Sequence, residues 1–219
     1  DRSNFGDTIF ANLYLSPFEG LPLVLYFDNA RPFFANPEDT TTELTYGQTL
    51  EAYFDRKGAF HAGYSKGLKG KQKEGAQDKI ETFFADSVLE NFIRLQTFCL
   101  LLDRYLADDH QLEILFAGYA SPLADSTYNK RLTARRVASV INHFKAYNGG
   151  VLIPYFESGR LRILLDPRGE EYQPDVSDDP MNRRMAEFSP EASRMRRVVI
   201  TEIRSASGEE LKIENLGER

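Results

Sequence analysis

The sequence predicts an α/β (α+β) fold, a two-layer sandwich in which one sheet of about four strands is covered by helices. Short apolar segments rich in β-branched and aromatic residues are spread along the chain. Longer segments, whose apolar residues keep helical spacing, separate them. This alternation favours a single sheet with helices packed on it. With 219 residues, 42% of them hydrophobic, the chain can bury the core of one ordinary domain.

The first strand is predicted at Leu21–Phe27, and Asp28 and Asn29 supply the turn that ends it. Asp39–Thr42 then offers N-caps for a helix. That helix carries an aromatic stripe with helical spacing, formed by Tyr46, Tyr53, Phe54, Phe60 and Tyr64. The stripe suits burial against the chain's own core or, alternatively, a groove in a partner protein.

A second helical region is predicted at Asp78–Leu106, with a break near Asp86 and Ser87. The stretch before it, Gly67–Gly75, is rich in glycine and lysine, which favours a solvated basic loop over a nucleic-acid site. Cys99 is the one cysteine of the chain and has apolar neighbours, so a buried, unreactive thiol is expected.

The second half of the chain continues the alternation of strands and helices. Asp125 is well placed to cap a helix over residues 126–147, which Asn148 and the two following glycines end. Ser189 followed by Pro190 predicts the start of a short helix. Three further strands are expected at Gln111–Ala117, Leu161–Leu165 and Val198–Ile203, with a long loop at Asp166–Pro180.

Composition and motifs exclude several functional classes. The net charge of −6 gives the surface no general attraction for nucleic acid or anionic lipid. No apolar run reaches the roughly 18 residues of a membrane span. His61, His110 and His143 have no other metal-type ligand at a familiar spacing, so neither metal nor cofactor is expected. The chain has no phosphate-binding loop and no nucleophile elbow, which argues against an enzyme.

A family resemblance is carried by Gly118-Tyr-Ala-Ser-Pro and by the helix motif that follows. The motif consists of Tyr128-Asn129, Leu132-Thr133, Arg135-Arg136-Val137 and Val140. In this register the chain resembles the peptidoglycan-associated OmpA-like domain. Leu25–Asp28 is similar to the first strand of that family, and Arg196–Ile200 to its last strand.

The resemblance implies a mixed sheet in the strand order of the family, with a domain at residues 21–204. A helical insertion at about 39–76 follows the first strand, because this stretch is longer than the family pattern. Residues 1–20 are then a lead-in or linker, and residues 205–219 a polar tail. The function implied is a non-catalytic module in the periplasm, or associated with the outer membrane, that anchors an envelope protein or assembly to the cell wall.

The family binds the diaminopimelate end of the peptidoglycan stem peptide. A helix arginine takes the carboxylate of this zwitterion, and an aspartate after the second strand takes the ammonium. Arg136 matches the arginine, whereas Ser121 stands at the aspartate position. A serine accepts a hydrogen bond without charge, so affinity for this ligand should be reduced or altered. Asp125 can replace the acid only by leaving its role as helix cap.

Helical geometry assigns different roles to the two neighbouring arginines. Arg136 falls with Asn129 on the margin of the core stripe and can lean towards the turn at Ala120, whereas Arg135 is expected to point into solvent. Arg136 then either reads a ligand or braces the helix. Asn129 bonds a ligand or a neighbouring loop, and Tyr119 flanks the site or packs beneath it.

A rival interpretation keeps the OmpA-like fold and removes the ligand. In that case the domain is a protein–protein interaction or structural module that uses the aromatic stripe to dock onto a partner.

Overall fold

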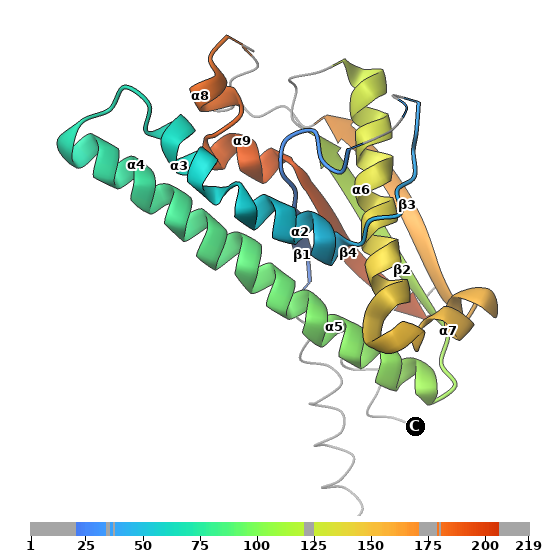
Figure 1. Cartoon of the computed structure of the whole chain (residues 1–219). Coiled ribbons are helices and arrows are strands. Elements are labelled where there is room, and N and C mark those ends of the chain that lie inside the picture. The colour runs from blue at the N-terminus through green and yellow to red at the C-terminus, as the bar shows by residue number, and fades with distance from the viewer. Residues whose placement is uncertain are drawn as a thin grey trace, which may run out of the picture.

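The structure, a computed structural model, describes residues 21–33, 36, 38–120, 125–170, 179 and 181–205. Within them the chain is an α+β protein with one open, mixed sheet, as predicted, and its layers are those of a two-layer sandwich (Figure 1). The sheet order is β1-β4-β2-β3. β4 runs antiparallel to both neighbours, and β2 runs parallel to β3. The strands are β1 (Leu23–Tyr26), β2 (Leu112–Ala120), β3 (Leu161–Glu170) and β4 (Arg197–Ser205).

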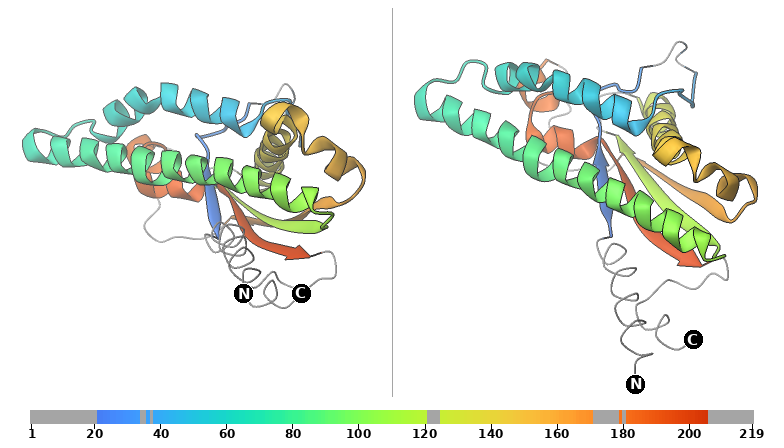
Figure 2. Two further views of the ribbon diagram at one scale, coloured as in Figure 1. Left: turned by 90° about the horizontal axis from the view of Figure 1, so that it is seen from below. Right: turned by 60° about the horizontal axis from the view of Figure 1, so that its bottom comes forward.

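One face of the sheet forms the core because side chains alternate along each strand. In β2, Leu112, Ile114 and Phe116 are buried, while Glu113 and Leu115 point to the other, half-exposed face. The helices gather over the buried face (Figure 2). The apolar core therefore lies between the sheet and the helices.

The aromatic stripe lies on two consecutive helices, α2 (Tyr46–Asp55) and α3 (Lys57–Tyr64). The cap of α2 is Thr45, in a capping box with Gln48, so the expectation of caps at Asp39–Thr42 is wrong. The stripe packs into the chain's own core: Tyr46, Tyr53, Phe60 and Tyr64 are buried, and Phe54 is partly buried against them. Of the two alternatives for the stripe, burial against the chain's own core is therefore the one that the structure shows, and these rings do not form a docking surface for a partner.

A long helical segment follows, made of α4 (Gly70–Thr82), the π-helix η1 (Phe83–Leu89) and α5 (Glu90–Ala107). The predicted irregularity at Asp86 and Ser87 falls within η1. The predicted loop Gly67–Gly75 is shorter than expected, because its lysines, glutamine and glutamate are good helix formers and α4 already begins at Gly70. The α3–α4 hairpin extends past the β1 edge of the sheet (Figure 1).

Cys99 lies on α5 and is buried, as predicted. Burial raises the pKa of its thiol to about 12, so the thiolate form is not populated at neutral pH.

The helix α6 (Ser126–Ala146) starts and stops as the sequence predicts. The carboxylate of Asp125 accepts hydrogen bonds from the backbone N–H groups of Thr127 and Tyr128, which confirms its capping role. The helix ends at the 3₁₀ turn η2 (Tyr147–Gly150), where Asn148 and Gly149 adopt positive φ. The short helix α9 (Pro190–Met195) also begins as predicted, with the Ser189 hydroxyl accepting from the Ala192 N–H.

Two short helices escape the sequence prediction: α7 (Ile153–Glu157) and α8 (Arg183–Ala186). β3 continues to Glu170, so the predicted loop does not begin at Asp166, because residues 166–170 still pair with β2. The rest of that loop lies almost wholly outside the described residues, as do the lead-in (1–20) and residues 206–219 of the tail. Among the helices that the structure describes, none has the length and apolarity to span a membrane.

Candidate functional site

The predicted site lies at the end of the sheet where β1 and β2 finish and β4 begins. The strand register places Tyr26 of β1 and Tyr119 of β2 on either side of Arg197. The guanidinium carbon of Arg197 lies 4.3 Å from the centre of the Tyr119 ring. The turn that follows β2, residues 121–124, lies outside the described residues, and Ser121 with it.

A close contact between β2 and α6 brings the helix motif to this end of the sheet. A Cβ atom at Gly118 would lie 2.1 Å from the Thr133 Cγ2 atom, far inside van der Waals contact. Glycine at residue 118 therefore allows the approach of α6, and Thr133 fills the space beside it. Both residues belong to the motif that suggested the family, and their packing gives that pattern a physical reason.

Arg136 lies at the end of β2, as the helical geometry predicts, but it is fully buried. Its guanidinium donates to three backbone carbonyls: Nη1 to Tyr119 at 3.1 Å, Nε to Arg31 at 3.1 Å and Nη2 to Asp28 at 3.3 Å. These bonds join α6 to the ends of β1 and β2. Of the two roles left open for Arg136, the described contacts are those of a brace.

The charge of Arg136 is held in an unfavourable environment. Burial lowers its pKa to about 9, and the neighbouring positive charge of Arg196 acts in the same direction. The group is still charged at neutral pH. The face of Phe27 lies 5.4 Å from its guanidinium carbon and offers a weak favourable contact.

The expectation that Arg135 points into solvent is wrong. Its side chain is fully buried, its Nη1 atom donates to the Asp39 carbonyl at 2.6 Å, and its guanidinium carbon lies 5.9 Å from the Tyr128 ring centre. The segment before α2 covers this side of α6, which the isolated helical wheel does not include.

The other predicted site residues differ in their relation to Arg136. Tyr119 is half-buried and provides its carbonyl to Arg136, and Ala120 is buried at the end of β2. Asn129 is buried on α6. Asp125 is engaged at the helix cap, so the structure keeps its carboxylate on backbone N–H groups.

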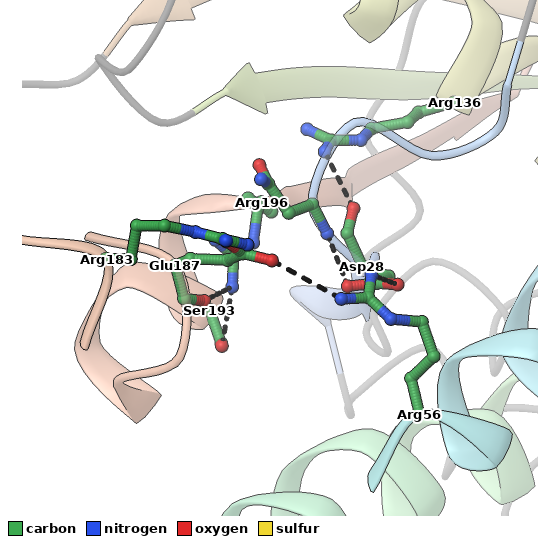
Figure 3. Close-up of polar contacts among 8 residues, drawn as sticks. Asp28, Arg56, Arg136, Arg183, Glu187, Ser193 and Arg196 are labelled. Atoms are coloured by element: carbon green, nitrogen blue, oxygen red, sulfur yellow. Dashed lines mark hydrogen bonds and ion pairs between the residues drawn. The ribbon is translucent and has the colours of Figure 1, made fainter. Parts of the chain in front are cut away.

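Sequence reasoning missed an ionic network beside Arg136 (Figure 3). Arg56, between α2 and α3, pairs with the buried Asp28 carboxylate at 2.5 Å and with Glu187 at 3.3 Å. Arg183 pairs with the second oxygen of Glu187. Asp28 looked like a turn residue, and no local pattern links it to Arg56 or to Glu187, which stand far away in the chain.

Arg196 completes the network at the start of β4 and is also fully buried. Its Nη2 atom donates to the Glu187 carbonyl at 2.8 Å and to the Ser193 hydroxyl at 2.7 Å. Neither Arg136 nor Arg196 contacts a carboxylate of the described residues, since Asp28 and Glu187 are paired with Arg56 and Arg183. This end of the sheet therefore holds buried positive charge in excess.

A second polar feature is an open groove between α2, α5 and α6. It has a volume of about 660 Å³, and its lining includes Glu51, Gln96, His143 and Tyr147. The His143 Nδ1 atom lies 3.4 Å from the Gly47 backbone N–H, which donates to it, and its Nε2 atom lies 2.9 Å from the Gln96 amide. Burial lowers the pKa of His143, so the ring is a neutral link between three helices.

Among the described residues, no group of three or more histidine, cysteine or acidic side chains is arranged to hold a metal ion. Comparison with known proteins adds no functional assignment: no family model matches the chain, and no match is found among curated proteins or solved structures.

Proposed function

We propose that the chain is a non-catalytic binding domain that recognises the diaminopimelate end of the peptidoglycan stem peptide and anchors an envelope protein to the cell wall. The proposal places the domain in the periplasm or at the outer membrane, and it interprets residues 39–76 as an insertion into an OmpA-like domain. The observation that carries it is the position of Arg136, which lies beside the end of β2 and bonds the Tyr119 carbonyl.

The chemistry of the ligand supports a binding site beside Arg136. A diaminopimelate terminus presents a carboxylate and an ammonium, and a guanidinium is the side chain best suited to the carboxylate. Arg136 and Arg196 bring two guanidiniums to one end of the sheet without a carboxylate contact in the described residues. In the bound state, Arg136 exchanges part of its carbonyl bonding for the ligand carboxylate. Ser121 offers the ammonium an uncharged acceptor, which predicts weak binding.

A second candidate function is favoured by the hydrogen bonds that the Arg136 guanidinium already makes within the domain. Because three carbonyls already occupy its guanidinium, Arg136 also fits the role of a brace in a domain that keeps the fold without the ligand. The domain would then serve as a structural or protein–protein interaction module. Its docking surface would be other than the aromatic stripe, which is buried.

A pull-down with purified sacculi separates the two candidates. If the domain binds the wall, the wild type should sediment with sacculi of the diaminopimelate type. Arg136→Lys keeps the charge but lacks the paired N–H donors of a guanidinium, so this variant should sediment several-fold less. The matched control is Lys130→Ala, because Lys130 is an exposed cation on the same helix. Thermal melts establish that both variants are folded. Absence of the wild type from the pellet, or equal loss in both variants, overturns wall binding through Arg136.

A further inference from the structure

Arg196 is a fully buried cation whose hydrogen bonding is incomplete. Its Nη2 atom has two acceptors, but its Nε and Nη1 atoms have no hydrogen-bond partner in the part of the chain that the structure describes. A buried donor without an acceptor costs free energy, and the cost is larger when the donor is charged. The arrangement therefore leaves two N–H-bearing atoms available to a negatively charged acceptor.

A second buried polar group lies beside them. The Tyr53 hydroxyl lies beside the Arg196 guanidinium and the Ser193 hydroxyl, but its contacts with them do not have the full geometry of a hydrogen bond. The Tyr53 side chain itself is almost wholly buried. A phenol hydroxyl can donate to an anion that a guanidinium also binds. Arg196, the residue between α9 and β4, and Tyr53 of α2 thus form a buried donor pair.

The surrounding charges favour an anion over a neutral group. The network holds four guanidiniums, those of Arg56, Arg136, Arg183 and Arg196, and two carboxylates, those of Asp28 and Glu187, an excess of two positive charges. The two guanidiniums without a carboxylate contact, those of Arg136 and Arg196, are the fully buried ones. Both carboxylates are engaged by Arg56 and Arg183. Uncompensated charge in a protein interior destabilises the fold, and a bound counter-ion offsets part of that cost.

We propose that Arg196 and Tyr53 form a binding site for a small oxyanion of the phosphate or carboxylate class, close to Arg136. Negative oxygens accept charge-assisted hydrogen bonds from the Nε and Nη1 atoms and an ordinary one from the phenol. Because the site is buried, the anion enters as the chain folds or opens locally. The bound anion neutralises part of the excess charge and stabilises the junction of α2, α9 and β4.

Thermal melts test the site without any wall peptide, so the outcome is independent of the proposed function. The protein is refolded with increasing inorganic phosphate, or with acetate as the carboxylate probe, at constant ionic strength. We expect a saturating rise of the melting temperature of at least about 2–4 °C with one or both anions. The arm that responds identifies the class of oxyanion.

Variants separate site binding from general stabilisation by salt. Arg196→Met should lose the anion-dependent rise and, without the anion, melt at or above the temperature of the wild type, because a buried charge has been removed. Tyr53→Phe should retain the fold and reduce the rise. The matched control, Arg162→Met, replaces an exposed arginine on β3 and should keep the full rise.

A structural measurement decides the matter if Arg196→Met fails to fold. Crystals of the wild type grown with selenate should show an anomalous peak beside Arg196 and Tyr53. The proposal is overturned if neither anion raises the melting temperature of the wild type, if all variants respond equally, or if phosphate raises it but selenate leaves no peak there.

Discussion

A methyl group at residue 118 would collide with the Thr133 side chain, so Gly118 decides how closely α6 approaches β2. This contact therefore also determines how close Arg136, on the same helix, lies to the end of β2. The glycine at residue 118 thus helps to position the Arg136 guanidinium. Gly118, Thr133 and Arg136 belong to one motif because all three take part in the contact between β2 and α6.

We predict that Gly118→Ala destabilises the protein by about 1–3 kcal/mol, the usual cost of overpacking a core. The double variant Gly118→Ala/Thr133→Ser should recover most of this loss, because serine lacks the Cγ2 atom that the new methyl group would meet. Urea unfolding of both single variants and the double variant provides the cycle. Additive losses in the double variant would show that the contact does not limit the approach of α6.

His143 makes the stability of the fold depend on pH. Burial lowers its folded-state pKa below the unfolded value of about 6.5, so the unfolded chain binds more protons in acid. The contribution of His143 to the free energy of unfolding should be fully present above the unfolded-state pKa. It should decline as the pH falls below that pKa towards the folded-state pKa, by at most about 1.4 kcal/mol per pH unit. Urea unfolding between pH 8 and pH 5 measures the slope. His143→Gln should flatten it; an equal slope in the variant assigns the effect to other groups.

The Ser121 position gives a prediction on ligand chemistry. If the turn after β2 holds the ammonium of diaminopimelate, Ser121→Asp restores an anionic acceptor and should strengthen binding of the stem peptide by roughly tenfold or more. Isothermal titration calorimetry of the two proteins gives the ratio. Unchanged affinity in the folded variant would place the ammonium elsewhere.

At the scale of elements, the consecutive helices α2 and α3 depend on aromatic burial, since their glycines weaken them. The ring of Phe60 meets the rings of Tyr53, Phe84 and Phe188 at centre distances of 5.3–5.8 Å. Gly63 allows this packing, because a Cβ atom there would lie 2.3 Å from the Phe188 ring. Both helices therefore contribute to the core.

We predict that Phe60→Ala costs about 3–5 kcal/mol, as for other buried phenylalanines. Phe33→Ala is the control, because Phe33 is 60% exposed and should change stability by less than about 0.5 kcal/mol. Chemical denaturation measures both. A small loss for Phe60→Ala would mean that α2 and α3 do not depend on this aromatic packing for their stability.

Local sequence signals predicted the elements better than the site. The cap at Asp125 and the cap at Ser189 depend on neighbouring residues only, and both were predictable. The burial of Arg135 and the pairing of Asp28 with Arg56 depend on segments that the fold brings together, which periodicity does not contain. The last strand was predictable at Val198–Ile203, but no local signal indicated that Arg196, just before it, is a buried cation.

For the whole molecule, the central proposal is that the end of the sheet beside Arg136 binds the carboxylate of diaminopimelate. Two stem peptides test it, identical except that one carries diaminopimelate and the other lysine, which has the same ammonium and lacks the carboxylate. Calorimetry with the wild-type chain should show binding of the diaminopimelate peptide that is at least roughly tenfold tighter, because only this peptide offers the charge-assisted contact. Equal affinity for the two peptides, or no binding of either, would contradict the claim.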